Sequence, residues 1–505
     1  KELLASGQLG YYHKIKSQIP EGLLEIIKIP GIGPKTAKML YEKLGIVSIP
    51  ELEKAVAEGK LINLTGFKEK TRENIIKGLD TYKKGRERAP LGAVWEEAQA
   101  LVARLKELKG VAAASAAGSV RRLKETVKDL DLVASSANPQ QVIDAFTAFP
   151  AVKEVLAAGG TKATVALQCG INADLRVVNP ESYGALLAHL TGSWAHNLRV
   201  HELAQSQGLK ANEYGMFEEK TGKKLAGSSE EGYYRVLGLP LIPPELREDG
   251  SEVDAALAGK LPHLVEAADI KGDLQLHTDW SDGAAKLEEV VEACHKRGYQ
   301  YLVITDHSKS LLVAHGLEED RLMRQIDEIR RLNERYSDMT VLAGSEVDIL
   351  GDGSLDYPDE LLAQLDFVLA SIHSGFARDK RAQTKRISKA MENRYVNLIG
   401  HISGRLIGER EPYELDYEEI FRVARDTNTF IEINAYPLRL DLSDVLCRRA
   451  RQLGVGLAIT SDAHNIPALD QMWFGVAVAR RAWLRKEDIL NCLDSADMLK
   501  AIKKH

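Results

Sequence analysis

The chain has 505 residues, of which 44% are hydrophobic and 6% aromatic, and its net charge is −6. This length exceeds one ordinary domain, so we expect about two to four domains. No apolar run approaches the roughly 18–20 residues of a membrane helix, and no secretory signal opens the chain. The four cysteines lack CxxC spacing, which is typical of a reducing compartment. We therefore expect a cytoplasmic protein without a membrane partner.

The charge is distributed unevenly along the chain. Residues 1–90 contain 17 Lys and Arg against 11 Asp and Glu. Residues 91–270 contain 18 against 23, and residues 271–505 contain 32 against 39. Only the N-terminal part is therefore a candidate for contact with a phosphate backbone. A solvated lysine-rich surface explains the same charge, so charge alone does not decide.

The N-terminal segment is predicted to form short helices separated by glycines. In "IPGIGPKTAKML", Gly31 and Gly33 flank one apolar residue before a helix, and such a turn leaves backbone N–H groups free to hold phosphate. Lys35 adds charge there, and "LTGFKEKTRENI" is a weaker copy with Gly66 and Lys68. The pattern resembles the helix–hairpin–helix motif, which binds the DNA backbone. A glycine cap between packed helices is the alternative.

A pair of aspartates marks the next segment. "WEEAQALVARLKEL" predicts an amphipathic helix, while "DLDLVA", "KATVALQC" and "INADLRVV" predict strands. Asp129 and Asp131 are two residues apart on one strand, so both point to one face. Neighbouring carboxylates repel unless a cation lies between them. Asp174 on another strand supplies a third carboxylate, and two divalent ions on such a trio can stabilise phosphoryl transfer.

A glycine–serine turn precedes this pair. Gly118 and Ser119 stand nine residues before Asp129, and Arg121 and Arg122 follow the turn. Arginine suits phosphate because its guanidinium is a planar fork of donors. An isolated Asp-x-Asp is common at solvated strand edges, but this combination resembles the nucleotidyltransferase superfamily. With the hairpins before it and "LTGSWAHNLR" and "GLPLIPPELRED" after it, the chain resembles the family X DNA polymerases.

This resemblance implies a template-directed DNA polymerase that fills short gaps during DNA repair. Its partners would be gapped or primer–template DNA and deoxynucleoside triphosphates, and it would be a monomer. Asp129, Asp131 and Asp174 would be catalytic and would hold two Mg²⁺ or Mn²⁺. The residues expected at the incoming nucleotide are Gly118, Ser119, Arg122, Gly192, Ser193 and Asn197.

Some positions depart from the family pattern. Lys128 stands where a glycine often precedes the first aspartate, and His189 and Leu190 replace an aromatic pair beside the sugar. Discrimination against ribonucleotides is therefore in question. Trp194 follows the Thr-Gly-Ser turn, where it stacks on a base or only packs. A non-catalytic gap-binding module is the alternative that these departures allow. The family's N-terminal lyase domain is expected to be largely absent.

The last 235 residues repeat a strand-like run that ends in a polar residue and precedes a helix. The seven runs are DLQLHT, YLVITDH, TVLAGSE, FVLASIH, NLIGHIS, FIEINAY and GLAITSDAH. Seven β–α units predict a barrel with its functional groups at the carboxyl ends of the strands. The candidate metal ligands at these ends are His277, Asp282, His307, Glu346, His373, His401, Asp462 and His464.

This part resembles the PHP phosphoesterase domain that is appended to bacterial family X polymerases. The resemblance implies up to three Mn²⁺ or Zn²⁺ and a 3′–5′ exonuclease or related phosphodiesterase activity. Such ions lower the pKa of a bridging water and neutralise a phosphodiester. The implied ligand sets are His277, Glu346 and Asp462; Glu346, His373 and His401; and Asp282, His307 and His464.

Gln275 stands where a histidine would complete an H-x-H pair with His277. A neutral amide oxygen is a poorer donor to a borderline metal than imidazole, so we expect a weakened first metal position. "GHISGR" around His401 also departs from relatives with proline there. An active polymerase whose barrel is only a metal-stabilised scaffold is therefore the main alternative. A small-molecule phosphatase is another, against which the hairpins argue.

The predicted fold is multidomain α/β. It comprises helix–hairpin–helix fingers, a nucleotidyltransferase palm, a thumb and a PHP (β/α)7 barrel. The expected ranges are 1–89 for the fingers, 90–185 for the palm, 186–250 for the thumb, 251–270 for a linker and 271–505 for the barrel.

Overall fold

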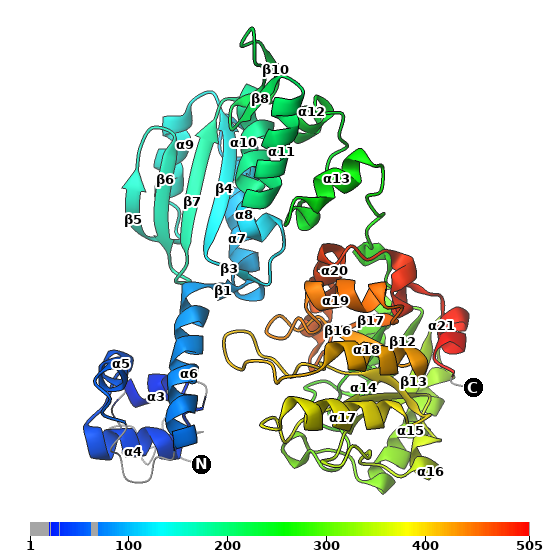
Figure 1. Cartoon of the computed structure of the whole chain (residues 1–505). Helices are drawn as coiled ribbons and strands as arrows, with labels where there is room; N and C mark the ends of the chain where they lie inside the picture. The colour runs from blue at the N-terminus through cyan, green and yellow to red at the C-terminus, as the bar shows by residue number, and fades with distance from the viewer. Residues whose placement is uncertain (1–19, 21, 30, 62–68, 504–505) are drawn as a thin grey trace, which may run out of the picture. The chain divides into compact units, whose positions relative to one another are not determined.

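The computed structural model describes residues 20, 22–29, 31–61 and 69–503 (Figure 1). The chain divides into two compact units, one of residues 1–88 with 405–411 and one of residues 89–404 with 412–505. Within the described ranges, no helix is both long enough and apolar enough to cross a membrane.

The first unit is helical. Its helices are α3 (Gly22–Ile26), α4 (Pro34–Leu44), α5 (Ile49–Ala57) and α6 (Glu69–Glu87). Fully buried apolar side chains such as Leu40 and Ile75 form its core. Gly31 has a φ of 82°, which favours glycine, and Gly33 is the N-cap of α4. Both glycines and Lys35 are exposed, while the second predicted copy, with Gly66 and Lys68, lies outside the described residues.

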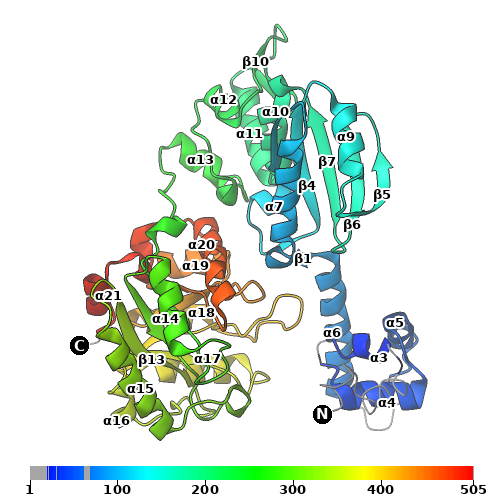
Figure 2. The same cartoon turned by 180° about the vertical axis from the view of Figure 1, so that it is seen from behind.

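The second unit begins with a five-stranded mixed sheet, the palm. In spatial order its strands are β2 (Val111–Ala116), β4 (Asp129–Ser136), β7 (Asn172–Val178), β6 (Lys162–Leu167) and β5 (Val152–Ala158). Figure 2 shows α7 (Leu91–Glu107) and α9 (Pro139–Thr147) on one face of this sheet. A short helix, α8 (Gly118–Arg121), and a small pairing of β1 (Ala89–Pro90) with β3 (Thr126–Val127) complete the palm.

Successive side chains of β4 point to opposite faces of the palm sheet. Leu130 and Leu132 are fully buried, whereas Asp129 and Asp131 point to the other side and are partly exposed. Val133 shares the side of the aspartates and packs in a cluster with residues of the following helix, α10 (Tyr183–Thr191). The helix therefore covers only the part of this face that lies beyond the carboxylates.

The thumb follows the palm. Its elements are η1 (Pro180–Ser182), α10, α11 (Trp194–Ser206), the antiparallel strands β8 (Leu209–Asn212), β9 (Gly215–Glu218) and β10 (Lys224–Ala226), α12 (Glu230–Arg235), η2 (Pro244–Leu246) and α13 (Ser251–Leu257). The buried His196 ring lies between two polar partners, with Nδ1 2.7 Å from Glu252 Oε1 and Nε2 2.8 Å from Tyr234 Oη. These contacts fix α11 against α12 and α13.

After η3 (Ala267–Asp269) the chain forms a seven-stranded parallel sheet, as predicted. The strands are β11 (Gly272–Leu276), β12 (Tyr301–Ile304), β13 (Thr340–Asp348), β14 (Phe367–Ser371), β15 (Val396–Ile399), β16 (Phe430–Asn434) and β17 (Leu457–Thr460), in this order. Two contacts nearly close it into a barrel. The N–H of His277 donates to the carbonyl of Ala463 (3.0 Å), and the buried Asn491 amide donates to Gly272 and Ile459.

Helices alternate with these strands and lie outside them (Figures 1 and 2). They are α14 (Leu287–Lys296), η4 (Leu312–Ala314), α15 (Glu319–Asn333), α16 (Asp359–Leu362), α17 (Lys380–Met391), α18 (Tyr417–Asp426), α19 (Asp444–Gln452), η5 (Ile466–Gln471), α20 (Met472–Arg481), η6 (Lys486–Asp488), η7 (Leu490–Cys492) and α21 (Ser495–Ala501). Leu490, Met498 and Ile502 join the barrel core. The carboxyl ends of the strands remain available for function.

Side chains of α20 also contact the palm and thumb within the second unit. The Arg481 guanidinium donates to the carbonyl of Arg122 (2.8 Å) and to Glu248 Oε1 (2.9 Å). The rings of Trp95 and Trp473 lie 4.4 Å apart. These are buried or half-buried contacts, since Arg481 is only 7% exposed.

Candidate active sites

The three palm aspartates come together through the pairing of β4 with β7. In the parallel register Asp131 lies opposite Asp174, and Asp129 lies opposite Asn172. Burial raises the pKa of Asp131 to about 6, with further contributions from Asp129 and Asp174. Two carboxylates in register on neighbouring strands thus form an anionic patch that favours a cation.

The turn before α8 explains why glycine precedes the serine. Gly118 has a φ of +57°, and an added Cβ would lie 2.0 Å from Asp131 Oδ2. The N–H of Ala117 donates to the carbonyl of Asp131 (2.8 Å), which holds the turn against β4. Any side chain at position 118 would therefore displace the carboxylate. Ser119 follows and is partly exposed.

Arg121 and Arg122 anchor the turn to the thumb. Arg121 donates to Thr191 Oγ1 (2.8 Å) and pairs with Glu230. Arg122 donates to the carbonyl of Thr191 and, through Nε, to Glu248 Oε1 (3.0 Å). Both guanidiniums are mostly buried. Their hydrogen bonds hold the Gly118 turn beside Thr191, which directly precedes the next segment predicted to bind the nucleotide.

That segment is the break between α10 and α11. Gly192 has a φ of 63°, and the Ser193 hydroxyl donates to the carbonyl of Glu248 (2.5 Å) and accepts from the N–H of His196 (3.2 Å). Asn197 Nδ2 donates to the carbonyl of His189 (2.8 Å). The predicted nucleotide residues therefore lie on two turns that Arg122 connects, one at Gly118 and one between α10 and α11.

Trp194 begins α11 next to this turn and is 79% exposed. The sequence left two interpretations of this residue, stacking on a base or packing within the protein. A buried ring would indicate packing. Its exposure instead leaves the indole available for a ligand.

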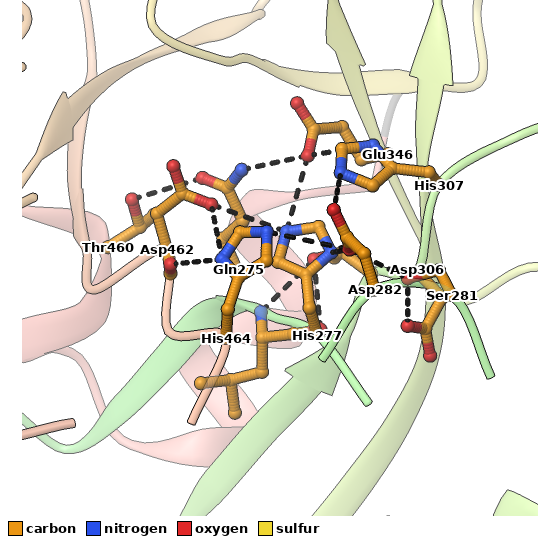
Figure 3. A network of polar contacts seen from close by, with 12 residues as sticks. Gln275, His277, Ser281, Asp282, Asp306, His307, Glu346, Thr460, Asp462 and His464 are labelled. Carbon is orange, nitrogen blue, oxygen red and sulfur yellow. Dashed lines mark hydrogen bonds and ion pairs between the residues drawn. The ribbon is translucent and has the colours of Figure 1, made fainter. Parts of the chain in front are cut away.

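A second metal-ligand cluster lies at the carboxyl ends of the barrel strands, centred on the fully buried Glu346 (Figure 3). Glu346 Oε1 lies 2.9 Å from His401 Nε2 and 3.2 Å from His373 Nε2. Glu346 Oε2 lies 3.3 Å from His277 Nε2 and 3.5 Å from His307 Nδ1. One carboxylate at the end of β13 thus contacts four imidazoles.

Asp282 and Asp462 continue the cluster away from Glu346. Asp462 Oδ1 lies 3.3 Å from His277 Nε2. Asp282 lies 3.7 Å from His307 Nε2 and 3.5 Å from His464 Nε2. Figure 3 shows these side chains turned toward one another from different strand ends. The eight predicted ligands therefore occupy one site.

Three compact groups of possible ligand atoms occur in the described part of the chain. They are His277, Asp282, His307 and His464; His307, Glu346 and His373; and His277, Glu346 and Asp462. The last is one predicted set, and the first contains another with one added histidine. The second has His307 where the prediction placed His401, although His401 also contacts Glu346. The palm aspartates form no such compact group among the described residues.

The donor set of the barrel fits divalent metals. Both ring nitrogens of His277 and Nδ1 of His307 are buried without a hydrogen-bond partner in the described residues. Buried polar atoms are rarely left unsatisfied unless another ligand takes them. Imidazole and carboxylate donors together suit Zn²⁺ and Mn²⁺.

The charges of the cluster balance one another. Burial alone would raise the pKa of Glu346, but His307 and His373 hold it well below its usual range. Burial would likewise lower the pKa of His373, but Glu346 and Asp348 raise it to about 9. For His307, burial dominates and lowers the pKa to about 4.

Several supporting residues were not predicted. His373 Nδ1 lies 2.6 Å from Asp348 Oδ1, an arrangement that orients a metal-binding imidazole. Asp306 accepts from the N–H and hydroxyl of Thr278 and from the Ser281 hydroxyl, which fixes the turn that carries Asp282. Asp306 directly precedes His307 in the sequence, and this position beside a predicted ligand is the signal that could have identified it.

The strand β16 contributes two further buried residues. Glu432 accepts from the N–H of His401 and from the Thr460 hydroxyl, and burial raises its pKa well above its usual range. Asn434 Nδ2 donates to Asp462 Oδ2 (3.0 Å). These residues stand on "FIEIN", the one run for which no ligand was predicted.

Gln275 lies inside the cluster rather than at its edge. Its Nε2 donates to Glu346 Oε2 (3.1 Å), and its Oε1 accepts from the Thr460 hydroxyl (3.3 Å) (Figure 3). The Gln275 amide therefore restrains one oxygen of the central carboxylate. Its contact with Glu346 gives the residue a positioning role that the sequence did not reveal.

Family models match three parts of the chain. A SAM-like helix-hairpin-helix tandem matches residues 23–81, a DNA polymerase beta thumb matches residues 186–248, and a PHP domain matches residues 273–436. Together with the palm carboxylates and the barrel cluster, they define a family X DNA polymerase that carries a PHP domain.

One relative matches the whole chain and another matches only a part of it. The chain is 40% identical over 507 residues to the DNA polymerase/3′-5′ exonuclease PolX of Bacillus subtilis (strain 168), covering 100% of this chain and 89% of that protein. A probable phosphatase of Thermoanaerobacter sp. (strain X514) is 29% identical over 230 residues, 43% of this chain and 89% of that protein. The chain therefore belongs to the PolX family.

Proposed function

We propose that the palm and thumb form a template-directed DNA polymerase that fills short gaps in DNA repair. The observation that supports this most directly is the register of Asp131 with Asp174, beside the turn at Gly118. Asp129 completes a trio that would hold two Mg²⁺ or Mn²⁺, with Asp174 close to the primer 3′-hydroxyl. Bound metal ions would stabilise charge on the attacking and leaving oxygens.

The incoming deoxynucleoside triphosphate would bind at the two turns described above. Ser119 and Arg122 would hold its phosphates, since both flank the Gly118 turn and Arg122 offers a planar donor fork. Gly192, Ser193 and Asn197 would line the sugar and the base edge. In the structure Arg122 is engaged by Glu248 and Thr191. A nucleotide would therefore compete with these partners for the guanidinium.

The helical first unit would bind the backbone of gapped or primer–template DNA. Gly31 and Gly33 are exposed at the start of α4, which places backbone N–H groups at a helix N-terminus. Lys35 lies exposed in the first turn of the same helix. The contact would be insensitive to base sequence and would weaken with salt. We propose a monomeric cytoplasmic enzyme.

The barrel would act as a metal-dependent 3′–5′ exonuclease. The unsatisfied imidazole nitrogens of His277 and His307 support occupancy by two or three Mn²⁺ or Zn²⁺. Bound ions would lower the pKa of a water and neutralise a phosphodiester. Around them, Asp348 orients His373 and Gln275 positions Glu346. A barrel that only stabilises the chain through its metals remains the second candidate.

One gel assay tests these activities together. A 5′-labelled primer on a gapped template is incubated with Mn²⁺, with and without nucleotides. Asp131→Asn should abolish extension and leave shortening intact, and His307→Ala should do the reverse. No extension by the wild type would refute the polymerase. Shortening that survives His307→Ala would refute the barrel nuclease, and no shortening by the wild type would favour the scaffold.

A further inference from the structure

A cavity of about 350 Å³ opens beside the barrel cluster. It lies between the segment that follows β16 and the segment that follows β17. Its walls include Tyr436 and Arg439 on one side, and Asp462, His464 and Gln471 on the other. This volume is at the lower end of the roughly 300–1,000 Å³ of small-molecule sites. The cavity therefore admits one nucleotide rather than a duplex end.

Hydrogen bonds connect the wall that contains Tyr436 to the predicted metal ligand Asp462. The N–H of Tyr436 donates to Asn434 Oδ1 (2.9 Å), and the same asparagine donates to Asp462 Oδ2 (3.0 Å). The carbonyl of Tyr436 accepts from the N–H groups of Arg439 (2.7 Å) and Leu440 (3.1 Å). A tight turn thus presents one aromatic and one cationic side chain to the cavity at a fixed distance from the cluster.

The chemistry of the walls matches a nucleotide. Arg439 Nε lies 3.6 Å from Asp462 Oδ2, so the guanidinium reaches the place where a phosphate would meet the metal ligands. The Tyr436 side chain is 37% exposed, which leaves a face for a base.

We propose that this cavity binds the 3′-terminal nucleotide of a DNA strand. The phosphate lies between Arg439 and the cluster at Asp462, and the base stacks on Tyr436. This inference rests on the proposed exonuclease and gives it a substrate subsite. It also separates the chain from phosphatases that act on a phosphate without a base, because an aromatic wall gains nothing from such substrates.

The reaction at this subsite is a hydrolysis. An oxygen of water bonds to the phosphorus of the terminal nucleotide. The bond from that phosphorus to the 3′-oxygen of the preceding nucleotide breaks, and the leaving oxygen takes a proton from the water. The terminal nucleotide then occupies the cavity as a 5′-monophosphate, so the free product should bind there too.

Product binding offers a test that does not depend on turnover. Binding of thymidine 5′-monophosphate to the full-length, Mn²⁺-loaded protein is measured by calorimetry, with ribose 5-phosphate as the probe without a base. Tyr436→Ala should weaken thymidine monophosphate binding about 5- to 100-fold, as expected for loss of base stacking. Tyr436→Phe should restore it, and ribose 5-phosphate should not respond to either change.

Arg439→Gln should weaken both probes at least about tenfold, because both carry the phosphate. Its matched control is Arg330→Gln, on the outer surface of α15, where the guanidinium is exposed. Bound manganese is counted in each variant by atomic absorption and should not change. If Arg439→Gln loses manganese, the arginine only balances the charge of Asp462, and its assignment to phosphate is overturned.

Two outcomes overturn the subsite as a whole. One is equal binding of both probes by the wild type, which would indicate a phosphate site without base recognition. The other is thymidine monophosphate binding that Tyr436→Ala leaves unchanged. Primer shortening is measured beside these assays. A wild type that binds thymidine monophosphate through Tyr436 but shortens no primer would refute the exonuclease and not the nucleotide site.

Discussion

The palm and the barrel hold their acidic groups in opposite ways. In the palm, Asp131 and Asp174 lie in register on neighbouring strands, and the half-exposed Lys162 lies 3.6 Å from Asp174 Oδ1. In the barrel, the carboxylate of Glu346 is surrounded by imidazoles and is fully buried. The charge of the palm carboxylates is therefore only partly balanced by neighbouring cations, whereas that of Glu346 is offset by its imidazole neighbours.

The two sites would stabilise a bound metal ion in different ways. Mg²⁺ binds through few carboxylates together with substrate phosphates, which suits a shallow, partly exposed patch. Mn²⁺ and Zn²⁺ accept imidazole and can be bound by a preformed enclosed site. We therefore expect the barrel to keep its metals during purification and the palm to lose them.

The largest effect should come from exchanging a carboxylate for its amide in each site. Asp131→Asn should reduce extension, and Glu346→Gln should reduce shortening and bound manganese, each by more than about 100-fold. Such losses exceed the 10- to 100-fold range typical of residues that only support ligands. Rates of both reactions are measured for both variants. Loss of both activities in either variant would contradict the independence of the sites.

A smaller loss is expected from Gly118→Ala. The new Cβ would lie 2.0 Å from Asp131 Oδ2 and displace a carboxylate that the palm needs in place. Extension should fall about 10- to 100-fold, as for loss of a supporting contact. Gly110→Ala is the control, because Gly110 also has a positive φ (87°) and its Cβ would lie 3.9 Å from Ser136 Oγ. Equal losses in both variants would attribute the effect to backbone strain.

Gln275→Ala should reduce primer shortening by about tenfold, in line with other residues that orient metal ligands. It removes the donor to Glu346 but none of the imidazoles. Asn397→Ala is a control from β15, where the buried amide bonds to the carbonyl of Ile502 at the other end of the barrel. If Gln275→Ala leaves rate and metal content unchanged, the amide has no positioning role.

The smallest effect concerns stability and pH. The pKa of Asp131 is about 6 in the metal-free folded chain and about 3.8 when unfolded. The folded state therefore holds this proton more tightly, and the charged carboxylate destabilises it above pH 6. In EDTA, Asp131→Asn should melt about 2 °C or more above the wild type at pH 7.5. The difference should shrink as the pH falls from 6 toward 4, and a constant difference would contradict the assignment.

The seven barrel strands were predictable because each apolar run ended in a polar or ligand-type residue and was followed by a helix pattern. The palm strands β2 and β5 were not predicted. β2 is rich in alanine and β5 is largely exposed, so neither carries the alternation of a half-buried strand.

Individual ligands were predictable from residue type, but their partners were not. The grouping of His307 with Glu346 and His373 depends on how far each side chain reaches across the barrel mouth. The role of Gln275 depends on the direction of its amide, and the cavity at Tyr436 depends on a turn whose hydrogen bonds are local. Sequence spacing specifies none of these three features.

The contacts of Arg481 bear on how this chain can be divided. A fragment ending at residue 270 would keep the palm and thumb, but it would expose the indole of Trp95 and remove one guanidinium partner of Glu248. Glu248 in turn pairs with Arg122 at the nucleotide turn. Division of the chain at residue 270 would therefore remove contacts that reach the nucleotide turn through Glu248.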